Sequence, residues 1–239
     1  MKKLLILLIA LLPFNFLRIL SYRILAGYKI SSDSRIGMFN FILCDKMTMK
    51  TASIGVLNRI NAHELDLANG SSIGRRNCIN DAYRVILDEK AMIVSGNHIV
   101  GTRAGLSPFK MNENFLAGYK TIITVGHRFD LSDTIEIGDN VTFGGTMSEV
   151  WTHGFDVNHV KIQQSVTVGS DVYIGSRCII LPGANIVERT SIGAGTVVSK
   201  AIDEPGFYVS SQLLRKADCQ DYSSMEGIVS RNGANFFRK

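Results

Sequence analysis

Aliphatic residues recur every six positions in the C-terminal half of the chain. The repeat runs through Ile162, Val168, Ile174, Ile180, Ile186, Ile192 and Val198, and a second set, from Val166 to Ile202, follows each of them after four positions. A helix buries residues with a period of 3.6 and an ordinary strand with a period of two, so the spacing fits neither. Six residues can form one flat side, and three sides close a coil of about eighteen residues that packs only on its neighbours. We therefore predict an all-β parallel β-helix.

The same spacing continues toward the N-terminus in shorter runs that differ in phase. These runs are Ile30 to Ile60, Leu67 to Val85, Leu87 to Ile99, and Ile137 with Phe143. Each change of phase predicts a loop or bulge between coils. The repeat is absent from residues 105–134, so we predict a long inserted loop there, and such loops are usually functional. A β-sandwich, the alternative all-β fold, would instead show alternation with a period of two.

The first 27 residues follow a different pattern. An apolar run from Leu4 to Leu12 is followed by polar residues, among them Asn15, Arg18 and Arg23, that are interspersed with apolar ones. The run is about half of the roughly 20 residues that a membrane span needs, and no small-x-small signal-peptidase motif follows it. Two interpretations remain open: a helix in a membrane interface, or a helix that caps the β-helix. We divide the chain into this helix (1–27), the β-helix (28–204) and a C-terminal extension (205–239).

Composition and charge narrow the range of partners. The chain has 239 residues, of which 46% are hydrophobic and 20% charged, as in ordinary globular proteins. The net charge of +5 lacks the clustering that nucleic acid requires. Part of it lies near the N-terminus, where it would favour an anionic membrane surface. The four cysteines lack C-x-x-C spacing, so we expect reduced thiols in a reducing compartment and no metal site.

Several segments resemble a known family. They read IEIGDNVTFGG, WTHGFD, VTVGSDVYIGSRCIILPGANI and SIGAGTVVSKAI, and they are similar to hexapeptide-repeat acyltransferases, especially galactoside and maltose O-acetyltransferases. The N-terminal LLPFNFLRIL before GYKISSDSRIG resembles the entry helix of a subgroup that acts in surface-polysaccharide synthesis. Residues 38–130 match only in the style of the repeat. The resemblance implies a left-handed β-helix, acetyl-CoA as acyl donor, and a homotrimer with active sites between subunits.

Acyl transfer to a hydroxyl needs a base, and histidine is suited to this because its unperturbed pKa is about 6.5. His153 lies in WTHGFD, where the repeat breaks, and the resemblance places the family's catalytic histidine there. His127, in the similar segment GHRFD, is the rival base or a residue of the acceptor pocket. Asp156 is a weak candidate to orient the imidazole and Glu149 a second one, although either acid also suits an exposed loop.

The resemblance also implies donor-binding residues. Gly175 and Ser176 match the position near the thioester, with Tyr173 where many relatives have tryptophan, and Ala194 matches a small residue beside pantetheine. Ser199, Lys200 and Arg215 would lie near the nucleotide. The same residues also suit tight corners or a solvated surface. After Lys200 the chain reads AIDEP, and later SSQ, where the family has an acid and a Gly-Pro step, which puts the adenine contacts in doubt.

These observations predict an acetyl-CoA-dependent O-acetyltransferase that acts on a sugar hydroxyl in surface-polysaccharide biosynthesis. We expect a cytoplasmic protein, peripheral at the inner face of the cell membrane through residues 1–25, with a small-molecule or glycan acceptor and no nucleic-acid partner. Two alternatives are an N-acetyltransferase of an amino sugar nucleotide and a non-catalytic β-helix scaffold.

Overall fold

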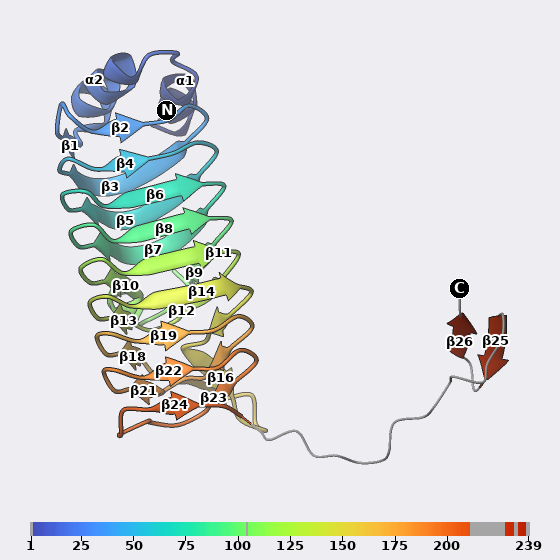
Figure 1. The fold of residues 1–239 in the computed structure, drawn as a ribbon. Helices are drawn as coiled ribbons and strands as arrows, with labels where there is room; N and C mark the ends of the chain where they lie inside the picture. The colour runs from blue at the N-terminus through green and yellow to red at the C-terminus, as the bar shows by residue number, and fades with distance from the viewer. Residues whose placement is uncertain (1, 104, 211–227, 232–233, 238–239) are drawn as a thin grey trace.

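The protein folds into a left-handed parallel β-helix closed at its N-terminal end by two helices (Figure 1). The computed structural model describes residues 2–103, 105–210, 228–231 and 234–237. The helices are α1 (Lys2–Ala10) and α2 (Asn15–Ala26). The coils follow one another along a single axis, and the predicted fold class is therefore confirmed.

One side of the coil is a nine-stranded parallel sheet. Its strands are β2 (Arg35–Ile36), β4 (Ser53–Ile54), β6 (Ser72–Arg75), β8 (Met92–Ser95), β11 (Ile122–Val125), β14 (Thr142–Thr146), β19 (Tyr173–Ile174), β22 (Ser191–Ile192) and β24 (Phe207–Tyr208). A 13-stranded sheet forms the other two sides. It contains β1 (Lys29–Ile30), β3 (Phe41–Met49), β5 (Arg59–Leu67), β7 (Cys78–Leu87), β9 (His98–Gly101), β10 (Asn114–Ala117), β12 (Arg128–Leu131), β13 (Ile135–Ile137), β15 (Glu149–Val150), β18 (Val166–Val168), β20 (Ile179–Ile180), β21 (Asn185–Ile186) and β23 (Val197–Val198).

Two antiparallel hairpins complete the strands. One pairs β16 (His153–Phe155) with β17 (Lys161–Gln163), and the other pairs β25 (Ile228–Arg231) with β26 (Ala234–Phe237). A short 3₁₀ helix, η1, spans Lys110–Asn112.

The six-residue repeat places one aliphatic side chain of each side in the core. Ile36, Ile54, Ile73 and Ile93 pair in register, and the column continues through Ile123, Phe143, Ile174 and Ile192. All eight are at most 1% exposed, so the core is a continuous column. Ile162 is an exception: it lies in β17 of the hairpin and is 48% exposed. The inward repeat of this half therefore begins at Val166 and Val168.

The predicted insertion at residues 105–134 is shorter than expected. Among the described residues of this region, 102–103 and 105–113 leave the coil, and strands β10, β11 and β12 form a regular coil after them. The aliphatic repeat is hidden there because Phe115 and Phe129 fill inward positions. Their rings meet edge to face at 5.1 Å, and Phe129 meets Phe143 at 5.3 Å. A second excursion, residues 151–165, contains the β16–β17 hairpin.

A ladder of buried polar side chains lines one corner of the coil. The Oδ1 atom of Asn58 accepts the backbone N–H of Asn77 at 2.9 Å, and the Oδ1 of Asn77 accepts that of Asn97 at 2.9 Å. The Oδ1 of Asn97 in turn accepts the N–H of His127 at 2.8 Å. Each rung thus satisfies a buried amide of the next coil, which would otherwise cost stability.

The two helices cover the open edge of the first coil. The Asn15 side chain accepts the backbone N–H of Ile36 and donates to the Ser34 carbonyl, and Arg18 Nε donates to the Ile36 carbonyl at 2.8 Å. Ile19 and Tyr22 pack into the core. Covering the edge in this way blocks pairing with other strands. The capping interpretation of residues 1–27 is therefore right for the inner face of these helices.

Candidate active site

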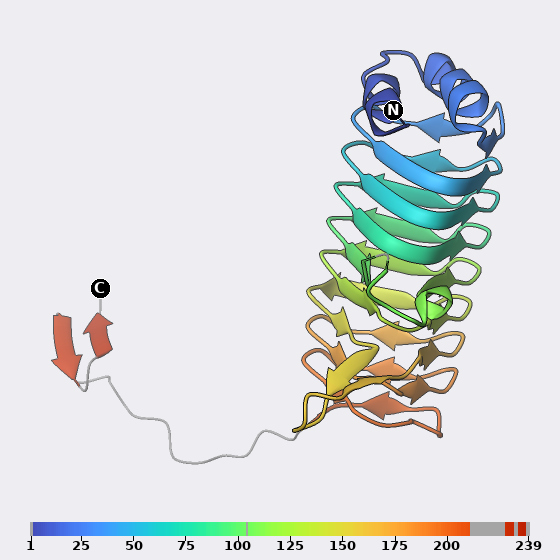
Figure 2. The ribbon, with the colours of Figure 1, turned by 180° about the vertical axis from the view of Figure 1, so that it is seen from behind.

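The candidate catalytic residues lie at one corner of the triangular coil, where the chain leaves the repeat. The excursion 151–165 begins directly after β15 and ends before β18. Figure 2 shows its hairpin, in yellow, against the outside of the C-terminal coils. His153 starts β16 and pairs with Gln163 of β17, so antiparallel pairing fixes its backbone.

His153 is held by a carboxylate from the preceding coil. Its Nδ1 lies 2.7 Å from Oδ2 of Asp130. Asp130 belongs to β12, and the pairing of β12 with β15 brings it close to His153. A carboxylate only accepts hydrogen bonds, so Nδ1 carries the proton and Nε2 keeps its lone pair. The side chains of His153 and Asp130 are 23% and 15% exposed. Because the ring is still partly accessible, Nε2 is suited to accept a proton from a bound hydroxyl.

Neighbouring groups brace this pair. The Thr152 backbone N–H and its Oγ1 both bond to Asp130 Oδ2, at 3.2 and 3.1 Å. Ser132 Oγ lies 3.0 Å from His153 Nδ1, and Lys161 Nζ donates to Ser132 Oγ at 3.1 Å. The cation of Lys161 therefore lies close to the pair without taking the carboxylate from the histidine.

Aromatic rings flank the imidazole. Trp151 and Phe155 meet His153 edge to face, with ring centroids 6.2 and 5.6 Å away. The Trp151 indole N–H donates to the Glu149 carboxylate at 3.0 Å, and the Arg128 guanidinium lies over the same indole. Glu149 is therefore engaged with Trp151 and not with His153.

Asp156 does not orient His153. Its Oδ1 accepts the backbone N–H groups of Asn158 and Val160, both at 2.8 Å, and so closes the tip of the hairpin. The acid that contacts the histidine is Asp130, which was not among the residues predicted from the sequence. It ends GHRFD, one coil before WTHGFD, and it reaches the histidine through the register of β12 with β15, which the two short segments do not reveal.

His127 is a rung of the buried ladder, fully shielded from solvent. Its Nδ1 accepts the Ser148 backbone N–H at 3.2 Å, and its Nε2 lies 2.9 Å from Thr124 Oγ1. Burial lowers its pKa from 6.5 to about 4, since desolvation opposes the charged form. Both ring nitrogens are engaged inside the coil, so His127 cannot act as the rival base or line an acceptor pocket.

Four of the predicted donor-binding residues gather at a different corner. Tyr173 begins β19, and Gly175 and Ser176 follow that strand before β20. Ala194 occupies the position of Ser176 one coil later, between β22 and β23. The Gly175 N–H donates to the Ile192 carbonyl at 2.8 Å, so this amide belongs to the coil and is not directed at a ligand. A Cβ atom on Gly175 would collide with the Ala194 backbone, which explains the glycine.

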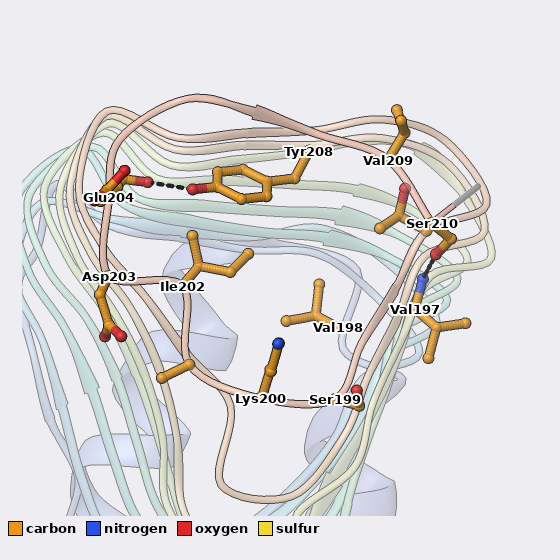
Figure 3. Close-up of a pocket in the computed structure, with 12 residues that line it drawn as sticks. Val197, Val198, Ser199, Lys200, Ile202, Asp203, Glu204, Tyr208, Val209 and Ser210 are labelled. Carbon is orange, nitrogen blue, oxygen red and sulfur yellow. Dashed lines mark hydrogen bonds between the residues drawn. The ribbon is translucent and has the colours of Figure 1, made fainter. Parts of the chain in front are cut away.

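Ser199 and Lys200 line a cavity of about 450 Å³ at the C-terminal end of the β-helix (Figure 3). Val198, Ile202 and Tyr208 face the same cavity, which lies where the core column ends at the last coil. The Tyr208 hydroxyl donates to the Glu204 carbonyl at 2.7 Å. Arg215 lies outside the described residues.

The two halves of the predicted site are therefore separated within one chain. Ser176 precedes β20 and His153 follows β15, and these strands pair on one side of the triangle. The two residues stand toward opposite ends of that side, because Ser176 lies opposite Thr146, seven residues before His153.

The fold and this corner define a left-handed β-helix protein with a braced histidine–aspartate pair at the point where the coil is interrupted. The particular proteins that it resembles are acetyltransferases. The chain is 32% identical over 96 residues to the galactoside O-acetyltransferase of Escherichia coli, covering 40% of this chain and 47% of that protein. It is 31% identical over 100 residues to a Saccharomyces cerevisiae protein that carries the name acetyltransferase, covering 39% and 47%. The resemblance to this family is confirmed, and the matches span about half of each relative. No protein-family model matches the chain.

Two solved structures are also similar. The polysialic-acid-specific acetyltransferase NeuO shares 15% identity, with 81% of this chain and 93% of that chain covered and a TM-score of 0.37. The polysialic acid O-acetyltransferase OatWY shares 14%, with 83% and 90% covered and a TM-score of 0.35. The fold described above rests on this protein's own strand pairing.

Proposed function

We propose that this protein transfers an acetyl group from acetyl-CoA to a hydroxyl of a sugar, with His153 as the general base. The observation that carries the proposal is the 2.7 Å contact of His153 Nδ1 with Asp130, which leaves Nε2 as the basic nitrogen at an accessible corner. The galactoside O-acetyltransferase relative supports a hydroxyl acceptor, and a surface glycan is the acceptor class that we favour.

In this mechanism His153 Nε2 takes the proton of the acceptor hydroxyl as its oxygen attacks the thioester carbonyl. The C–S bond then breaks, and the proton passes from Nε2 to the departing thiolate. Asp130 stabilises the imidazolium that forms in between, and Thr152 keeps the carboxylate in place. General-base catalysis of this kind contributes about 10²–10⁴ in rate.

The donor would lie between two subunits of a homotrimer. One subunit supplies the His153 corner and its neighbour supplies the corner of Tyr173, Ser176 and Ala194, since one chain holds these corners apart. Closed rotational symmetry repeats this interface, so each trimer would hold three equivalent sites. Ser199 and Lys200, at the C-terminal end, would face the phosphates of the donor.

The proposal is tested by measuring thiol release from acetyl-CoA with a panel of neutral sugars and amino sugars. We expect release with hydroxyl acceptors and a product that mild alkali cleaves, as an ester is. A product stable to alkali would show an amide and favour the N-acetyltransferase alternative. Protein that releases no thiol with any acceptor, although acetyl-CoA raises its melting temperature, would contradict the proposed base.

A further inference from the structure

The two N-terminal helices carry an apolar surface that faces away from the coils. Their inner face, with Ile6, Ile9 and Tyr22, is buried. The outer face, here called the cap surface, consists of nine large apolar side chains that are each at least 47% exposed. They are Leu4, Leu7, Leu8, Leu11, Phe14, Phe16, Leu20, Ile24 and Leu25. The two helices contact each other, and exposed apolar side chains gathered in this way mark interaction sites.

The charge around the cap surface has one sign. No Asp or Glu precedes Asp33, whereas five Lys and Arg residues do. The other 21 Lys and Arg of the chain are balanced by its 21 Asp and Glu, so the net charge of +5 arises entirely from the first 32 residues. Lys3, Arg23 and Lys29 are exposed, while Arg18 is buried against the first coil. An apolar face flanked by cations is complementary to an anionic lipid surface.

We propose that the cap surface docks the protein onto an anionic membrane, with the helices lying in the interface. Among the residues that the structure describes, no helix is long and apolar enough to cross a membrane. The helices have 9 and 12 residues, well short of the roughly 20 residues that a membrane span needs. The two interpretations of residues 1–27 are thus compatible, because the inner face caps the coil and the outer face binds lipid.

Docking at this end would orient the β-helix. The helices sit over the first coil, so the coil axis would rise from the membrane (Figures 1 and 2). His153 follows β14, the sixth strand of its sheet counted from β2. Five steps of about 4.8 Å place it roughly 24 Å beyond the first coil. A further consequence rests on the proposed function. Because of this distance, the acetylated sugar of a lipid-linked glycan would lie several sugar units away from the lipid.

The proposal is tested by flotation of the full-length protein with vesicles of phosphatidylcholine, with and without phosphatidylglycerol. We expect flotation with the anionic vesicles that weakens as salt is added, since salt screens surface charge. The triple variant Leu8→Gln, Phe16→Gln, Ile24→Gln should float at least tenfold less. The matched control, Leu106→Gln, Met111→Gln, Val157→Gln, changes side chains that are 72%, 67% and 93% exposed elsewhere and should float like the wild type.

Equal flotation of both variants, or wild-type protein that stays with neither vesicle, would overturn the proposal. Sedimentation velocity without lipid separates it from self-association: a wild type that forms larger assemblies than the cap variant, and does not float, would show that a second copy covers the surface. An unchanged melting temperature confirms that the cap variant is folded. Its transfer to a soluble sugar should match the wild type, so loss of docking and loss of catalysis are distinguishable.

Discussion

Two histidine–aspartate pairs lie at the same corner of the coil, one in each half of the protein. In the N-terminal half His63 Nδ1 lies 3.0 Å from Asp45, on long strands that run around the corner without a break. In the C-terminal half His153 contacts Asp130 where the strands are short and the chain leaves the coil. Residue type and position are shared, so the surroundings must decide which pair can serve as a base.

The surroundings differ in how firmly the carboxylate is held. The Asp45 side chain is 69% exposed, and the His63 ring stacks on Tyr83 with centroids 4.8 Å apart. Exposed ion pairs of this kind contribute little to the stability of a protein. Asp130 is 15% exposed and takes two further hydrogen bonds from Thr152. A largely shielded, braced acid fixes the tautomer of its histidine, which is the property that a general base requires.

The largest expected effect separates the two histidines. His153→Ala should lower the rate of thiol release by about 10²–10⁴, because it removes the general base. His63→Ala should remain within about twofold of the wild type, since its pair lies about four coils away from the proposed base. Steady-state kinetics with acetyl-CoA and a sugar acceptor measures both. Equal losses of rate in the two variants would contradict the assignment of His153 as the base.

The next largest effect is expected in kcat and distinguishes three aspartates. Asp130→Asn keeps the shape of the side chain but removes the charge that orients His153, so we expect a fall in kcat of roughly 10²-fold or more with little change in KM. Asp156→Asn and Asp45→Asn should each stay within about twofold, because neither contacts His153. The result would contradict the assignment if Asp156→Asn were the more damaging change.

A smaller effect concerns stability and the buried His127. Its pKa is about 4 in the folded protein and about 6.5 when unfolded. Between these values only the unfolded chain takes up the proton, so stability is complete above pH 6.5 and falls as the pH drops toward 4. The expected loss between pH 7 and pH 4.5 is about 2–3 kcal/mol.

His127→Asn continues the asparagine ladder and removes the titrating group. Urea unfolding at pH 7 and pH 4.5 should show an acid-induced loss smaller by about 2–3 kcal/mol in this variant, whatever its stability at pH 7. An identical pH dependence in both proteins would mean that other groups dominate the acid response.

The sequence predicted the fold well because a coil stack repeats one local rule. A six-residue period needs only nearest-neighbour packing, so it is visible without any long-range information. The prediction failed in two places. Phe115 and Phe129 fill inward positions that are aliphatic elsewhere, so a regular coil was overlooked. Ile162 keeps the six-residue period, although it lies in the exposed hairpin.

The candidate site could be predicted only in part, because a sequence shows local patterns and not the register of neighbouring coils. His153 stands out because the repeat breaks around it. Its partner Asp130 is 23 residues earlier, and the choice between Asp130 and Asp156 depends on the register of adjacent coils. His127 and His153 have similar local sequences, yet one ring points into the coil and the other lies at its corner, a difference that a short motif does not contain.

If each site combines the His153 corner of one subunit with the Ala194 corner of its neighbour, two inactive variants should complement each other when they are mixed. His153→Ala lacks the base, and Ala194→Trp should block the donor corner, which is exposed at Ala194. Co-expression of the two variants should restore activity to about a quarter of the wild-type level, since random assembly leaves both corners intact at that share of trimer interfaces. Mixed trimers that remain as inactive as either variant alone would contradict the account.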